Sequence, residues 1–195
     1  MIMSELVWRG VSVPSLERCR ITEDASGVRI ASTVEGESDC IYELSATVGW
    51  EFRSLVLRTD ARTLVVTRAN GEWSVDAAPR PDLVKAREVD ISVSPLSNTL
   101  PIRRLALDVG QSAEIITAYV RVPELTVTVD PQRYTRLSAD EYLYESLDSD
   151  FRRTITVDDG GLIVDYPGLF EREDPGTSTG RPSKGDRQSC GRQDG

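Results

Sequence analysis

Apolar and polar residues alternate with a period of two along most of the first 170 residues of the chain. Where apolar residues occupy every second position, the positions between them are mostly Arg, Glu, Thr, Ser or Asp. This alternation is typical of strands that bury one face and expose the other to water. Long helical periodicity is nearly absent, so the pattern predicts an all-β protein with little helix. The clearest alternating segments are residues 28–34, 40–48, 89–93 and 125–129.

Short turn signals separate these segments. Asn70-Gly71 lies between two apolar runs, and both residues tolerate the positive φ that a two-residue hairpin turn requires. Asp159-Gly160-Gly161 separates two further extended segments in the same way. Segments and turns together predict about a dozen strands in one domain, arranged as a closed or rolled antiparallel sheet.

Three segments depart from simple alternation. The sequence Ser-Ala-Asp-Glu at 138–141 matches a capping box, so a short helix over residues 142–147 rivals a strand there. In residues 50–57 the aromatic side chains fall on one face and the leucines on the other, which predicts either a bulge or a strand whose two ends face different layers. In residues 113–122 both faces are largely apolar, which predicts a strand covered on both sides.

The composition changes near residue 173. From residue 174 onward the sequence consists of Gly, Ser, Thr, Pro, Gln and charged residues, and apart from its prolines it has one apolar side chain, Cys190. Such a segment buries too little surface to offset roughly 1 to 2 kcal/mol of backbone entropy per residue. We therefore expect a folded domain over residues 1–172 and a disordered polar tail over residues 173–195.

Charge limits the partners of the chain. It has 23 basic and 32 acidic residues and a formal net charge of −9. The basic residues are interspersed with acidic ones, whereas nucleic-acid binding needs clustered Lys and Arg, so we expect no nucleic-acid partner. No stretch approaches the roughly 18 apolar residues of a spanning helix, and the first ten residues lack the features of a signal peptide. We expect a cytoplasmic protein without stable membrane insertion.

The chain contains no histidine, which excludes mechanisms and metal sites that need an imidazole. Its three cysteines, Cys19, Cys40 and Cys190, include no C-x-x-C pair, and we interpret them as small core residues or free thiols. Gly-rich phosphate loops, EF-hand loops and G-x-S-x-G elbows are also missing from the sequence. We therefore expect no metal, no cofactor and no catalytic residue, and favour a binding protein over an enzyme.

Residues 94–107 (SPLSNTLPIRRLAL) carry the most information. The two prolines stiffen the backbone, which predicts a shaped loop leading directly into a strand. The alternation of side chains along that strand places Arg103 on the apolar face and Arg104 on the solvent-exposed face. A guanidinium on an apolar face must be paired or must lie at the mouth of a cavity. Arg103 is then either a structural tie, for example to Asp90, or an anchor for an oxygen-rich or anionic head group.

Five motifs follow one another along the chain: SPLSNTLPIRRL from Ser94, YVRVP from Tyr119, QRYT from Gln132, YLYES from Tyr142 and GLIVDYPG from Gly161. In order and spacing they resemble the bacterial family named Putative glycolipid-binding. The resemblance covers roughly residues 6–172. It implies a single-domain spiral β-roll with a cavity, and it implies no catalytic residue.

The candidate ligand contacts combine these motifs with aromatic residues. Aromatic rings can contact alkyl or sugar C–H surfaces while their polar tips orient hydroxyls. The candidate ligand-binding residues are Arg103, Asn98, Arg104, Trp50, Tyr42, Tyr134, Tyr144 and Glu145.

Three hypotheses follow. The leading one is non-enzymatic binding of a glycolipid or another amphipathic small molecule in the cavity of the roll. The first alternative is a carboxylate-based hydrolase acting on a sugar or lipid ester, with Glu141, Glu145 and Asp165 as candidates, which requires two carboxyls facing each other across a pocket. The second is a protein-interaction module with a filled core. Long edge strands would make a homodimer a further expectation.

Overall fold

The computed structural model describes residues 1–173, which form one 15-stranded sheet and a short helical segment. The all-β prediction is confirmed, whereas the predicted tail from residue 174 onward lies outside the described residues. The strands are β1 (Ile2–Gly10), β2 (Ser15–Asp24), β3 (Gly27–Gly36), β4 (Cys40–Ala46), β5 (Phe52–Arg58), β6 (Thr63–Ala69), β7 (Glu72–Val75), β8 (Ala78–Pro79), β9 (Glu88–Ile91), β10 (Ser112–Arg121), β11 (Thr126–Arg136), β12 (Glu141–Ser146), β13 (Arg152–Val157), β14 (Ile163–Tyr166) and β15 (Phe170–Glu173). The helices are η1 (Pro81–Leu83), η2 (Pro95–Asn98) and α1 (Thr99–Leu105).

The strand count exceeds the predicted dozen because several strands are very short. β8 spans 2 residues, and β7, β9, β14 and β15 span 4 residues each. So few residues hold at most two periods of an alternating pattern, and the pattern does not separate them from the turns beside them.

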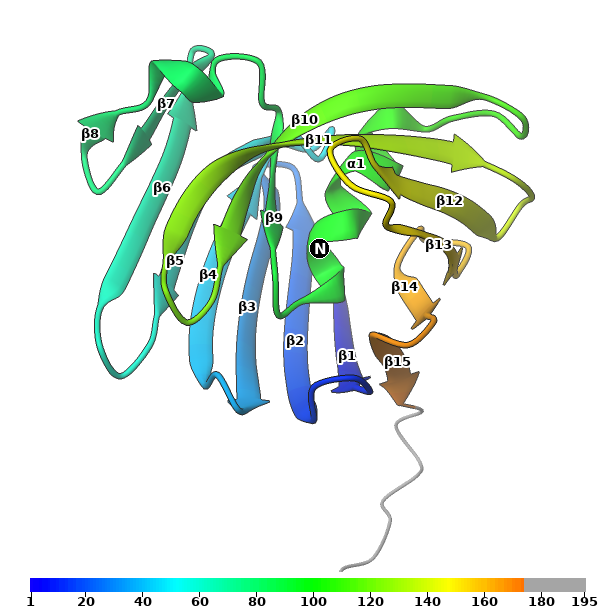
Figure 1. Ribbon diagram of the computed structural model, residues 1–195, viewed down its shortest axis with the longest axis horizontal. Coiled ribbons are helices and arrows are strands. Elements are labelled where there is room, and N and C mark those ends of the chain that lie inside the picture. The colour runs from blue at the N-terminus through cyan, green and yellow to red at the C-terminus, as the bar shows by residue number, and fades with distance from the viewer. Residues whose placement is uncertain (174–195) are drawn as a thin grey trace, which may run out of the picture.

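Two meanders meet in the middle of the sheet. β1 to β8 follow in chain order toward one edge, and β15 back to β10 lead toward the other edge, where β9 is added. β9 pairs in parallel with β10, whereas the other neighbours pair antiparallel, including β1 with β15. Figure 1 shows the sheet curled around α1, with β10 and β11 passing over the first meander. Two arginines fix this overlap, since Arg62 donates to the carbonyl of Leu125 and Arg80 to that of Val127.

Residues 95–105 are helical, so the predicted loop and strand are wrong. Ser94 is extended and its Oγ accepts a hydrogen bond from the amide of Leu96, while Pro95 takes the first position of η2. A capping serine followed by proline is a common helix start, because Pro has no N–H to leave unpaired. η2 continues into α1, which ends where Ala106 takes a left-handed conformation. The cap therefore outweighs the two-residue alternation that places Arg103 in a strand.

The smaller predictions have mixed outcomes. Asn70 and Gly71 both have positive φ, 54° and 85°, in the turn between β6 and β7, as predicted. The expected bulge is present as a register shift between β4 and β5. Residues 141–146 form β12, so the rival short helix does not form. In β10, Thr117 on one face and Ala118 on the other are both buried, which confirms that the strand is covered on both sides.

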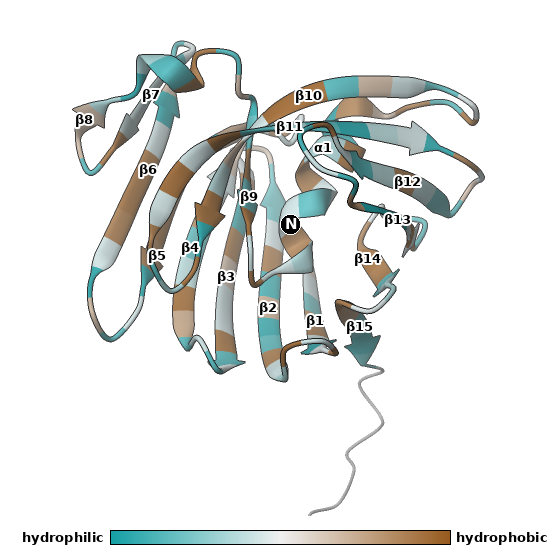
Figure 2. Ribbon diagram, viewed as in Figure 1, coloured by the Kyte–Doolittle hydropathy of each residue, from teal (hydrophilic) through white to brown (hydrophobic). Residues whose placement is uncertain are grey.

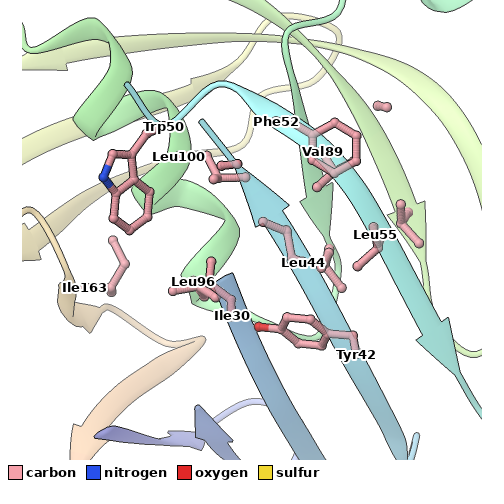
Figure 3. Packing of buried hydrophobic residues seen from close by; sticks show 14 of the residues in the cluster. Ile30, Tyr42, Leu44, Trp50, Phe52, Leu55, Val89, Leu96, Leu100 and Ile163 are labelled. Carbon is pink, nitrogen blue, oxygen red and sulfur yellow. The ribbon is translucent and has the colours of Figure 1, made fainter. Parts of the chain in front are cut away.

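The hydrophobic core fills the space between the first meander and the helical segment. Figure 3 shows Leu96 and Leu100 directed toward Ile30 and Leu44 of β3 and β4. The alternation that predicts the strands is visible in Figure 2 as bands of opposite hydropathy along them. Within residues 1–173 we find no helix with the length and apolarity needed to cross a bilayer.

Candidate ligand-binding site

A cavity of about 490 Å³ is lined by residues of β9, β10, β11, β12 and β14. The end of the helical segment and the residues after β14 complete its wall. Most of its lining is polar, in contrast to the core on the other side of the helical segment. The lining residues include Asp90, Ser92, Ser94, Asn98, Tyr119, Arg121, Asp130, Tyr144, Ser146, Asp148, Phe151, Tyr166, Leu169 and Phe170.

One wall of the cavity is acidic. Asp90 on β9 and Asp130 on β11 both accept hydrogen bonds from the side-chain nitrogen of Gln132, at 2.7 and 2.6 Å. Burial raises the pKa of Asp130 to about 6, and the charges of Asp90 and Asp148 add to this effect. Burial also raises the pKa of Asp90, against the hydrogen bonds from Ser97 and Gln132. Two carboxyls thus share one amide donor in a place where ionising both is costly.

Another part of the wall is aromatic. Tyr144, Phe151, Tyr166 and Phe170 line the cavity, and the centroids of successive contacting rings are 5.9 to 6.5 Å apart. These spacings are typical of edge-to-face and tilted aromatic packing. Burial raises the pKa values of Tyr144 and Tyr166, so both hydroxyls stay neutral at physiological pH. The lining of the cavity therefore combines aromatic rings and neutral hydroxyls with carboxyls.

A second, more apolar groove of about 360 Å³ adjoins the cavity. The two spaces share Ser92, Leu169 and Phe170 in their walls. The other apolar side chains of the groove are Val13, Val34, Val93 and Val122, from four further parts of the chain. A polar compartment thus lies beside an apolar one.

A buried carboxyl lies behind the cavity wall at Ser94. Glu17 on β2 is 2% exposed, and one of its oxygens accepts hydrogen bonds from Tyr42, Ser32 and Ser94 at 2.6, 2.7 and 2.9 Å. Burial raises the pKa of Glu17 to about 7, although the three hydroxyl donors oppose this effect. Because Ser94 also lines the cavity, its hydroxyl connects the buried carboxyl to the ligand space.

The comparisons with known proteins agree with this geometry. The family model described as "Putative glycolipid-binding" matches residues 5–172, nearly the whole of the described chain. The chain belongs to this family. The fold of the chain is also that of a DUF1089 family protein from Pseudomonas aeruginosa, known from a crystal structure, with 33% sequence identity and a TM-score of 0.71. That match covers 80% of this chain and 92% of the other. No curated protein matches the chain significantly.

Two of the ligand contacts predicted for this family member line the cavity. They are Asn98, at the end of η2, and Tyr144, on β12. Asn98 donates a hydrogen bond of 2.7 Å to the hydroxyl of Tyr134, which is fully buried behind the wall. Tyr42 is buried as well and takes part in the Glu17 cluster. These two tyrosines support the wall without lining the space.

The remaining predicted contacts lie away from the cavity lining. The Arg103 guanidinium stacks 4.4 Å above the ring of Trp50 and pairs with Glu23 at 3.5 Å. This geometry matches the structural alternative for Arg103, but with Glu23 as its partner rather than Asp90. The guanidinium stands against the β13–β14 turn, at Gly160 and Gly161.

Arg104 and Glu145 are also held by ion pairs. Arg104 pairs with Glu88, which is fully buried. Arg104 therefore links α1 to β9 instead of lying on a solvent-exposed face of a strand, as predicted. Glu145 pairs with Arg133 at 3.6 Å. Both pairs lie outside the cavity lining.

The carboxyls named for a hydrolase are not in the cavity lining either. Glu141 is exposed, Glu145 pairs with Arg133, and burial raises the pKa of Asp165 on β14. The carboxyls that do reach the cavity include Asp90 and Asp130, which project from one wall and share Gln132.

The acidic wall was not predicted from the sequence. Asp90 lies between Val89 and Ile91, and Asp130 follows Val129, so each takes a polar position of the alternation, which in an isolated strand looks like an ordinary exposed position. Only the roll of the sheet brings that face of β9 to β11 against a second layer. A usable signal is the double burial predicted for residues 113–122, because neighbours of a strand covered on both sides cannot have a fully exposed face.

Proposed function

We propose that the protein binds a glycolipid or another amphipathic small molecule without transforming it, with the polar head in the cavity and the alkyl part in the groove. The observation that carries this proposal is that the two spaces are neighbours, since Ser92, Leu169 and Phe170 line both. A polar site beside an apolar one matches a molecule with one polar and one apolar end.

The chemistry of the cavity wall supports a polyhydroxylated head group. The carboxyl oxygens of Asp90 and Asp130 accept hydrogen bonds, whereas Asn98 and the tyrosine hydroxyls can donate or accept them. Aromatic faces add contact with the C–H surfaces of a sugar ring. Asn98 and Tyr144 are the two predicted contacts that we retain in the proposed site.

The size of the cavity favours ligand binding over a protein-interaction module. Sites for small molecules commonly have volumes of about 300 to 1,000 Å³, a range that includes both spaces. The edges of the sheet are β8 and β9, of 2 and 4 residues, so a homodimer paired through long edge strands finds little support. Association of two chains and a cytoplasmic location remain predictions from the sequence.

Calorimetric titration with octyl glucoside, glucose and octanol, each below its aggregation concentration, tests the proposal. We expect the glycoside to bind at least about tenfold more tightly than either fragment, because only it occupies both spaces. Phe170→Ala removes a ring that both spaces share and should weaken octyl glucoside binding. Val65→Ala, at a half-exposed position outside both linings, is the matched control. Octanol binding as tightly as the glycoside, or no binding by any of the three, would contradict the proposal.

A further inference from the structure

The cavity holds two carboxyls that form no ion pair within residues 1–173. They are those of Asp90 and Asp130, and their shared partner Gln132 is neutral. Asp148, from the turn after β12, adds a third carboxyl to the lining. The positive charge in the lining is that of Arg121, whose side chain is exposed and therefore screened by water.

The aromatic wall is suited to a cation. Ring faces carry partial negative charge and attract an ammonium or guanidinium within about 6 Å. One ring already shows this behaviour, since the Arg153 guanidinium lies 4.8 Å from the centroid of Phe151. Tyr144, Tyr166 and Phe170 line the same cavity and have no such partner among the cation and ring pairs of the described residues.

We propose that the head group taken by this cavity carries an ammonium, as in an amphiphile built on an amino sugar. The ammonium would donate charge-assisted hydrogen bonds to Asp90 and Asp130 and face the tyrosine rings. It would also relieve the repulsion between the carboxyls, which no neutral sugar can do. Phosphate and sulfate head groups are disfavoured by the same charges. This inference rests on the proposed function and narrows it to one class of ligand.

Three octyl glycosides with one sugar skeleton test the inference at pH 7: octyl glucosaminide, its N-acetylated form, and octyl glucoside. We expect the amine to bind about tenfold or more tightly than the other two, the usual effect of a hydrogen bond to a charged group. Octyl phosphate should bind more weakly than octyl glucoside. If the glucoside or the phosphate binds as well as the amine, the ammonium inference fails and the proposed function stands. If none of the glycosides binds, both fail.

Asp130→Asn gives the sharpest variant, because Asn keeps the shape and can still accept the hydrogen bond from Gln132. The ratio of the amine affinity to the octyl glucoside affinity should fall to less than about threefold. Asp60→Asn, which removes an exposed charge outside the cavity lining, should leave the preference intact. An unchanged preference in Asp130→Asn would overturn the assignment of this carboxyl.

Acidification provides a second readout. The groups that face Asp130 are Asp90, Asp148, Arg121 and the neutral hydroxyls of Tyr119, Tyr144 and Tyr166. Asp130 takes up its proton near pH 6, whereas the amine keeps its own, so the preference for the amine should decline between pH 7 and pH 5. A preference that rises over this range would contradict the inference, and Asp130→Asn should flatten the profile.

Discussion

The two meanders of the sheet enclose interiors of different kinds. Against the first meander, aliphatic side chains such as Leu44 and Leu55 belong to the same filled core as Leu96 and Leu100 of the helical segment. Against the second, β9 to β11 contribute carboxyls and β12 to β15 contribute aromatic rings to the lining of an open space. One continuous sheet thus contributes stability through one half and ligand chemistry through the other.

Two carboxyls show the same difference on a smaller scale. Glu17, on the first meander, is enclosed by three hydroxyl donors and has its pKa raised to about 7 by burial. Asp130, on the second, keeps access to the cavity, and its pKa is raised to about 6 with help from neighbouring charges. Burial without a cation raises the pKa in both, but only Asp130 can gain a counter-charge from a ligand.

The largest expected effect comes from a cavity created in the filled half. Leu55→Ala removes a side chain that is 0% exposed and should lower the free energy of unfolding by about 2 to 5 kcal/mol. Val129→Ala, at a position that is 40% exposed and lines the cavity, should change it by no more than about 0.5 kcal/mol. Urea denaturation measures both values. Equal losses would remove the distinction between the two interiors.

Glu17 should make stability depend on pH. The carboxyl ionises near 4.5 when unconstrained and near 7 in the folded protein, so its contribution is complete below pH 4.5 and is lost as the pH rises to 7. The loss is on the order of 3 kcal/mol. Glu17→Gln keeps the three hydroxyl hydrogen bonds through its carbonyl and should remove this part of the dependence. Denaturation of both proteins from pH 4 to 8 measures the difference, and parallel curves would show that Glu17 ionises normally.

A smaller effect separates two tyrosines that the sequence places in one group. Tyr134→Phe leaves the buried Asn98 amide without its acceptor and should cost about 1 to 3 kcal/mol. Tyr144→Phe removes a hydroxyl that lines the cavity and should cost about 0.5 kcal/mol or less, while weakening octyl glucoside binding. Thermal unfolding and calorimetry together test the pair. If Tyr144→Phe loses more stability than Tyr134→Phe, Tyr144 supports the cavity wall and Tyr134 contacts the ligand.

Local patterns predict the strands well, because alternation and turn residues act within a few positions. The Asn70-Gly71 turn and the bulge beside β5 both follow from neighbouring residues. The helical segment departs from this rule, because the cap at Ser94 and the four-residue spacing of Leu96 and Leu100 outweigh the two-residue alternation around Arg103.

The site was predicted only in part, since it depends on contacts between distant strands. Asn98 and Tyr144 were named from motifs and line the cavity. Asp90 and Asp130 both accept hydrogen bonds from Gln132, which lies 42 residues from Asp90 and 2 residues from Asp130 along the chain. No local sequence pattern predicts that the two carboxyls share this partner. Arg103 is the opposite case, because a charge beside apolar residues signals a constraint but does not say whether a ligand or Glu23 satisfies it.

The pairing of β1 with β15 has a consequence for synthesis of the protein. These strands are neighbours in the middle of the sheet although about the whole described chain separates them, with Gly10 opposite Phe170. On the ribosome, one side of β1 therefore stays an open edge until residues 170–173 emerge. The first meander can form hairpin by hairpin, but the two meanders join only after translation of β15. A nascent chain stalled before that point would expose a 9-residue strand edge, a favourable place for a chaperone to bind.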